Sequence, residues 1–293
     1  MVSADKLFNG RYELTNGLLR IGTSGYSYAD WRGTFYPKTM KSTEYLKFYA
    51  KYFDTVEIDS VYYGIPSPRV FEEISRKVPS NFRFSVKTPS TFTHDIARYD
   101  ETLEHFRRSV NPIQRKGLIE CILAQFPYSF KTNPDSLAHI KQITNDIGDL
   151  AHLCVEFRNI EWQTEDTTRF LKDIGVGYVN VDLPRIPNLP VLSSIFTSDI
   201  GYFRFHGRVD EKIWWTPAKS YDRYNYEYRH GELLEMLPYI KRVEEKTKTT
   251  YAFFNNHQGG KSARAALDLK KTLGFEVKPE PPAFSHKQTI LFQ

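Results

Sequence analysis

The chain has 293 residues, of which 40% are apolar and 26% charged, and its net charge is +5. This composition is typical of an ordinary globular protein, and the charge mildly favours anionic partners while lying far from a histone-like basic excess. No apolar run approaches the roughly 18 residues that a membrane span needs. The N-terminus lacks the charged-then-apolar pattern of a secretory signal. We therefore expect a cytoplasmic protein with no membrane partner, whose two cysteines, Cys121 and Cys154, are reduced and buried.

Eight short apolar runs recur along the chain, and nearly every one ends in a polar or charged residue. Helical patterns, recognised by apolar residues three or four positions apart, lie between most of these runs. A repeating strand–helix order predicts a parallel sheet, and eight such units predict a (β/α)8 TIM-type barrel, an α/β fold in a single domain. The expected strands are 18–23, 55–59, 82–87, 118–126, 153–158, 176–182, 202–206 and 250–256.

The regular pattern is interrupted twice and stops before the C-terminus. Residues 183–200, rich in proline and serine, are predicted to lack a helix, and residues 207–231 form a long insertion after the seventh strand. The sequence therefore predicts three parts: an N-terminal extension (1–17), the barrel (18–275) and an extended C-terminal tail (276–293).

The polar residues that end the apolar runs mark the predicted barrel mouth, because active sites of such barrels collect at the carboxyl ends of the strands. Side chains alternate in direction along a strand, so we predict that Glu156, Arg158, Arg204 and His206 form one polar cluster there. The alternative is an ion-pair network that only closes the top of the barrel. The predicted mouth holds Glu57, Asp59, Lys87, Gln125, Glu156, Arg158, Asp182, Arg204, His206, Asn255 and Asn256.

Within the mouth, His206 is the leading candidate for general acid–base catalysis, because its ordinary pKa lies near neutrality. The predicted catalytic set is completed by Glu57, Glu156 and Asp182. The same four side chains could hold a divalent metal ion, although two nearby arginines oppose a bound cation. Lys87 could neutralise an anion or form a Schiff base, and the anion role is favoured. Ligand binding is assigned to Lys87, Gln125, Arg158, Arg204, Asn255 and Asn256.

Two aromatic loops and one glycine turn also indicate a ligand. The loop after the first strand carries Tyr26 and Trp31, and the insertion after the seventh carries Trp214, each among further aromatic residues. Such loops stack on bases or sugars, or pack on themselves as a lid. The last strand–helix junction contains Gly260 and Lys261, where converging amides at a helix N-terminus predict a phosphate site. The alternative is a plain glycine turn.

Several stretches of the sequence, most of them at predicted strand ends, follow a known pattern: IGTSGYSYADWRGTFYP (21–37), TVEIDS (55–60), VK (86–87) with TH (93–94), QFP (125–127), VEFR (155–158), FHG (205–207) and FNN (254–256). Together they resemble the YecE-like family, domain of unknown function seventy-two, whose activity is unassigned. The resemblance implies a TIM-type barrel and leaves the function open. The sequence departs from the family pattern at Asp59, where asparagine is commoner, and near Ala265, where an asparagine is usual.

The sequence favours a barrel that binds a phosphate-bearing ligand, either a nucleotide or a nucleic acid, at its mouth. If the protein is an enzyme, we expect a hydrolase that acts on this ligand by acid–base or metal-assisted chemistry. One alternative is a carbohydrate-active barrel that uses paired carboxylates, and another is a non-catalytic binding or adaptor protein. In the tail, residues 288–292 (QTILF) resemble peptides that bind the bacterial DNA sliding clamp. The alternative for this segment is a tail that packs back onto the barrel.

Overall fold

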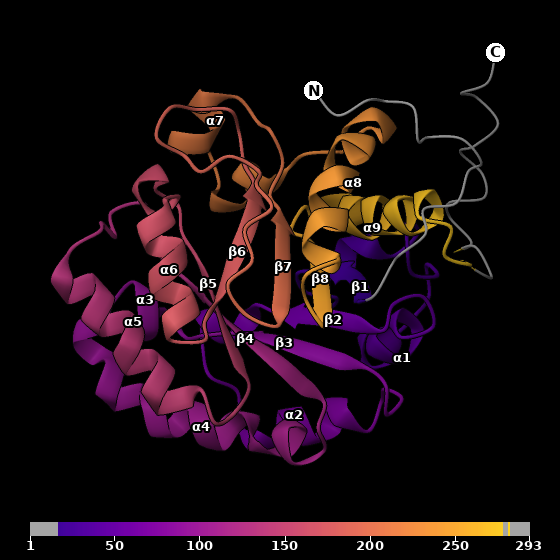
Figure 1. The fold of residues 1–293 in the computed structure, drawn as a ribbon. Coiled ribbons are helices and arrows are strands. Elements are labelled where there is room, and N and C mark those ends of the chain that lie inside the picture. Colours follow the sequence, from indigo (N-terminus) through magenta and orange to yellow (C-terminus); the bar gives the residue numbers. More distant parts are fainter. Residues whose placement is uncertain (1–16, 278–280, 282–293) are drawn as a thin grey trace.

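The computed structural model describes residues 17–277 and 281, and it confirms the predicted (β/α)8 barrel (Figure 1). Eight parallel strands follow one another in the order β1-β8-β7-β6-β5-β4-β3-β2. Each lies within two residues of its predicted position at either end. The strands are β1 (Leu18–Thr23), β2 (Thr55–Ile58), β3 (Arg83–Lys87), β4 (Ile119–Gln125), β5 (His152–Glu156), β6 (Gly177–Asp182), β7 (Ile200–Phe205) and β8 (Thr249–Phe254).

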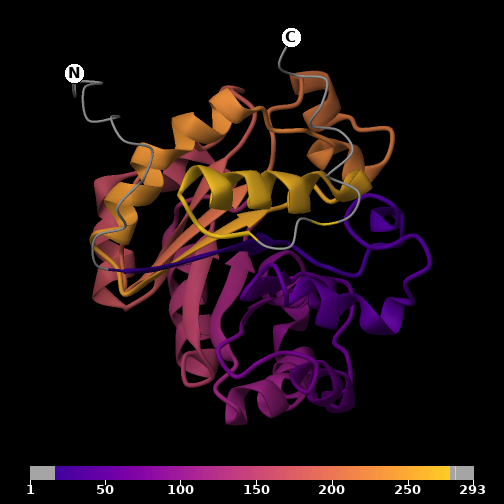
Figure 2. The same ribbon diagram turned by 90° about the vertical axis from the view of Figure 1, so that its right-hand side faces the viewer.

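The helices cover the outside of the barrel, and α9 lies across β1 and β8 (Figure 2). Local signals fix their ends: the Asn133 side chain accepts from Ser136 N at 2.9 Å and caps α5, whose first residue is a proline. The helices are α1 (Tyr45–Tyr49), α2 (Pro68–Ser75), α3 (Ser90–Thr93), α4 (Tyr99–Arg115), α5 (Pro134–Ile147), α6 (Glu165–Asp173), α7 (Glu211–Trp215), α8 (His230–Glu244) and α9 (Lys261–Thr272).

The barrel closes at a seam between β1 and β2, where a single bridge replaces a full ladder. Gly25 N donates to Glu57 O at 2.7 Å beside the bridge between Ser24 and Glu57. A Cβ atom at Gly22 would lie 2.5 Å from Thr55 O. Glycine at this position therefore lets β1 approach β2 closely enough to close the mouth.

The two irregular segments occupy the positions expected of them. Residues 183–199 contain no helix, which leaves a groove of about 1010 Å³ between this segment and α8. The insertion after β7 carries α7 and the 3-10 helix η6 (Ser220–Tyr224), and α7 lies beyond the upper ends of β6 and β7 (Figure 1). In the described part of the chain, no helix is both long enough and apolar enough to cross a membrane. The sliding-clamp segment 288–292 lies outside the described residues.

Candidate active site at the barrel mouth

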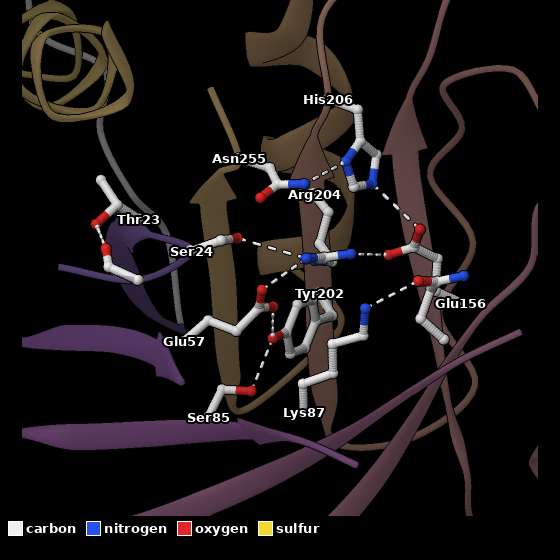
Figure 3. A network of polar contacts seen from close by, with 12 residues as sticks. Thr23, Ser24, Glu57, Ser85, Lys87, Glu156, Tyr202, Arg204, His206 and Asn255 are labelled. Carbon is white, nitrogen blue, oxygen red and sulfur yellow. Dashed lines mark hydrogen bonds and ion pairs between the residues drawn. The ribbon is translucent and has the colours of Figure 1, made fainter. Parts of the chain in front are cut away.

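Arg204, near the end of β7, joins two carboxylates inside the mouth (Figure 3). Its Nη2 donates to Glu57 Oε1 at 2.7 Å, and its Nη1 donates to Glu156 Oε2 at 2.6 Å. None of the three side chains is more than 2% exposed. Because an unpaired buried charge costs several kcal/mol, this shared guanidinium lowers the cost of burying both carboxylates, and Arg158 beside Glu156 supplies the second positive charge.

Glu156 also contacts the other two members of the predicted cluster. Arg158 Nε lies 2.6 Å from Glu156 Oε1, and His206 Nε2 lies 3.1 Å from the same oxygen. Arg158 Nη2 is 3.3 Å from His206 Nε2. The prediction that these residues and Arg204 form one polar cluster is confirmed. The role of the cluster in catalysis stays a prediction.

The remaining oxygen of Glu57 is also occupied. Tyr202 OH donates to Glu57 Oε2 at 2.6 Å and lies 2.7 Å from Ser85 Oγ (Figure 3). Burial alone would raise the pKa of Glu156, but Arg158, Arg204 and the contact with His206 hold it well below its ordinary value. Both carboxylates are therefore held by protein partners on all four of their oxygens.

His206 is held as a neutral imidazole with a defined tautomer. Asn255 Nδ2 lies 3.1 Å from His206 Nδ1, and an amide nitrogen only donates, so Nδ1 accepts and the ring proton sits on Nε2, facing Glu156. Burial, followed by the charge of Arg158, lowers the pKa of His206 to about 3. Proton transfer by His206, as predicted from the sequence, would require these contacts to open.

Lys87 and Asp59 lie in the same mouth, outside this ion-pair cluster. Lys87 Nζ donates to Gln125 Oε1 at 2.9 Å and lies 4.1 Å from the centre of the Tyr62 ring. Burial and the nearby Arg204 lower the pKa of Lys87 to about 8. Burial and Glu57 raise the pKa of Asp59 to about 6. Both groups therefore change charge close to neutral pH.

These side chains open into a cavity of about 520 Å³, which is large enough for a small organic ligand. Its lining combines charged and amide side chains with several tyrosines and tryptophans. Among these, Tyr63 is 87% exposed and Trp215 is 39% exposed. The cavity is lined by Asp59, Tyr62, Tyr63, Lys87, His94, Gln125, Pro127, Tyr128, Arg158, Leu189, Arg204, Trp214, Trp215, Ser220, Tyr221, Arg223, Tyr224, Asn255 and His257.

Asp182 and Asn256 lie away from the central cluster. Asp182 Oδ1 accepts from Arg208 Nε at 3.0 Å, and its Oδ2 accepts from Tyr228 OH at 2.6 Å. Asn256 Nδ2 donates to the backbone oxygens of His206 and Tyr224. On β6, the preceding Val181 belongs to the cluster of side chains inside the barrel, so Asp182 points outward. Asn256 lies two residues beyond the end of β8.

The four predicted metal ligands therefore do not converge. Arg204 lies between Glu57 and Glu156, and Asp182 belongs to the separate network with Arg208. Within residues 17–277 and 281, no group of three or more histidine, cysteine, aspartate or glutamate side chains is arranged to hold a metal ion.

Tyr26 and Trp31 of the first loop do not line the cavity. Trp31 is fully buried, and its Nε1 donates to His257 O at 2.5 Å. Burial raises the pKa of Tyr26 to about 12, and its carbonyl accepts from Tyr36 OH at 2.6 Å. Trp214, by contrast, lines the cavity and lies 5.5 Å from the guanidinium carbon of Arg158.

The amides of the last strand–helix junction donate within the protein. Gly259 N donates to Asp30 Oδ2 at 2.7 Å, and Gly260 N donates to His257 O at 3.2 Å. Lys261 Nζ donates to Asn225 Oδ1 at 2.5 Å. A phosphate at this junction would have to displace these contacts, and the anion site stays a prediction.

Tyr202, Ser85 and Tyr62 also belong to the site, although the sequence pattern predicts no role for them. The signal for the first two is the alternation of side chains: Tyr202 lies two positions before Arg204, and Ser85 two before Lys87, so each shares the inward face. Tyr62 follows β2 in a short 3-10 helix and has no comparable signal. Asp59 was placed in the mouth but given no chemical role.

Comparison with known proteins places these features in a family. A family model described as "Protein of unknown function DUF72" matches residues 20–288. UPF0759 protein YunF of Bacillus subtilis is 26% identical over 281 residues, covering 90% of this chain and 98% of that protein. A DUF72 family protein from Thermotoga maritima is 36% identical, with a TM-score of 0.78 over 88% of this chain and 99% of that one. Another from Enterococcus faecalis is 27% identical, with a TM-score of 0.77 over 88% and 96%.

Proposed function

This chain belongs to the DUF72 family of proteins of unknown function, and from that premise we propose that its barrel mouth binds a small phosphate-bearing ligand with a planar ring, of the nucleotide type, beside an acid–base group. The observation that carries the proposal is a cavity lined both by cations that form no ion pair in the described part of the chain and by exposed aromatic side chains. A volume of about 520 Å³ suits a single nucleotide or sugar phosphate better than a nucleic-acid duplex.

The cations are the first support. Within residues 17–277 and 281, neither Lys87 nor Arg223 forms an ion pair with a carboxylate, although both line the cavity. The charges of Arg158 and Arg204 are offset by their ion pairs with Glu57 and Glu156. A phosphate entering the cavity would therefore meet two cations that are not already neutralised.

The aromatic wall is the second support. Trp214, Trp215 and Tyr221 come from the insertion after β7, and Tyr62 and Tyr63 come from the loop after β2. Stacking of a base on an aromatic side chain contributes about 1–3 kcal/mol. A ligand that carries both a phosphate and a flat ring would use the cations and the aromatic wall together.

The surroundings of the three carboxyl groups favour Asp59 as an acid–base group and argue against glycoside hydrolysis by Glu57 and Glu156. A glycosidase needs two carboxyl groups free to act on the sugar, whereas all four oxygens of these glutamates are engaged by protein groups. No side chain in the described part of the chain donates a hydrogen bond to the Asp59 carboxylate. Its pKa of about 6 suits proton transfer near neutral pH.

Isothermal titration calorimetry with adenosine and uridine 5′-monophosphates tests the proposal. We expect binding that weakens with salt and falls at least tenfold in Lys87→Met. The matched control is Lys172→Met, because Lys172 lies 5.2 Å from the Phe196 ring on the outside of the barrel. Equal affinity of the two variants for these nucleotides, or no binding at millimolar concentration, would overturn the proposal.

A further inference from the structure

We propose that Lys87 is a nucleophile that forms an imine with an aldehyde or ketone group of the ligand. The inference rests on the proposed function and narrows the substrate class to phosphate-bearing carbonyl compounds. It assigns to Lys87 a covalent role, whereas the sequence favoured simple neutralisation of an anion.

The neighbours of the Lys87 amine are the first argument. Its hydrogen-bond partner is Gln125 Oε1 at 2.9 Å, a neutral acceptor, and Gln125 is oriented by the bond from its own Nε2 to Phe126 O at 2.8 Å. An amine and an ammonium group both donate to an amide oxygen, so this contact positions Nζ in either charge state. A carboxylate partner would instead hold the proton on the lysine.

The wider electrostatic environment is mixed. Arg204 and Arg158 oppose a charge on Lys87, while Glu156 and Glu57 favour it. Asp59 and His94 also face it, and burial together with Lys87 itself lowers the pKa of His94 to about 4, which leaves that ring neutral. Glu156 and Glu57 raise the pKa of Lys87 by less than burial and Arg204 lower it, and the resulting pKa is about 8. At pH 8 about half of the side chain is then free amine, compared with under about 1% for an ordinary lysine.

Asp59 supplies the proton transfers that imine formation needs. The Lys87 nitrogen forms a bond to the carbonyl carbon, and the C=O π pair moves to oxygen. The Asp59 carboxylate takes one proton from that nitrogen and passes it to the oxygen, which gives a neutral carbinolamine. The carboxylate then takes the second N–H proton and passes it to the same oxygen, the nitrogen lone pair forms the C=N bond, and the C–O bond breaks to release water. One amine and one carbonyl compound give one imine and one water, with no oxidant or reductant.

Pyridoxal 5′-phosphate is a suitable probe, because it combines an aldehyde, a phosphate and a planar ring. The imine is trapped by reduction with sodium borohydride, and the modified lysines are identified by peptide mass spectrometry. We expect Lys87 to be modified at least tenfold faster than Lys172 at pH 8, with a rate that rises with pH and has its midpoint near the Lys87 pKa of about 8. Excess pyridoxine 5′-phosphate, which has an alcohol in place of the aldehyde, should protect Lys87.

Lys87→Arg cannot form the imine, so the adduct formed at this position should be lost while Lys172 is modified at the wild-type rate. If wild-type protein binds pyridoxine 5′-phosphate in calorimetry but Lys87 is modified no faster than Lys172, the imine is refuted and the proposed function stands. If neither pyridoxine 5′-phosphate nor the nucleotides bind, the proposed function itself fails.

Discussion

Replacement of Asp59 by asparagine should stabilise the protein, and the gain should grow with pH. The pKa of this carboxyl group is about 6 in the folded protein and 3.8 in the reference state. Between these values the folded state binds more protons than the unfolded state, so stability falls as pH rises. This pKa difference of about 2 lowers the free energy of unfolding of the wild-type protein by about 3 kcal/mol well above pH 6 and by about 0.5 kcal/mol at pH 4. Asparagine carries no charge at either pH, so the variant does not lose this stability.

Urea unfolding of wild type and Asp59→Asn at pH 4 and pH 8 measures this effect. The difference in unfolding free energy between the two proteins should increase by about 2–3 kcal/mol from the lower to the higher pH. Asp173→Asn is the matched control, because Asp173 is exposed on α6, and its difference should change by less than about 0.5 kcal/mol. A difference for Asp59→Asn that is flat or decreases with pH would refute the electrostatic reasoning about the mouth.

Three further predictions concern other parts of the chain. Arg204→Met leaves two buried carboxylates without their shared cation and should lower the unfolding free energy by about 3–5 kcal/mol, measured by urea titration; a loss under about 1 kcal/mol would contradict the ion-pair assignment. His206 should show no titration in nitrogen-15 NMR between pH 8 and pH 5 and should keep its proton on Nε2, since its pKa is about 3; a midpoint near pH 6.5 would show that the ring is not locked. If the tail docks on a sliding clamp, Leu291→Ala with Phe292→Ala should abolish clamp binding in a pull-down, and absence of binding by the intact chain would remove that hypothesis.

The positions of the eight strands are determined by local sequence alone. A strand buried on both faces of a parallel sheet needs a nearly continuous apolar run, and runs such as that of β4 cannot be accommodated on a solvent-exposed element. The common location of the polar strand ends also follows from the sequence, because every strand of a parallel barrel ends at the same mouth. Alternation pairs Glu156 with Arg158 and Arg204 with His206 on one face of each strand. The outward direction of Asp182, which the sequence had placed in the mouth, came only from the structure.

Which charges meet, and which remain without a partner, was decided only by the tertiary structure. Arg204 is 147 residues from Glu57, and their contact depends on the diameter and closure of the barrel, to which the Gly22 seam contributes. The protonation states follow from that geometry, since burial and neighbouring charges make His206 neutral and bring Asp59 and Lys87 close to neutral pH. A sequence fixes residue types with ordinary pKa values, whereas the shifts depend on distances and solvent exposure that exist only after folding.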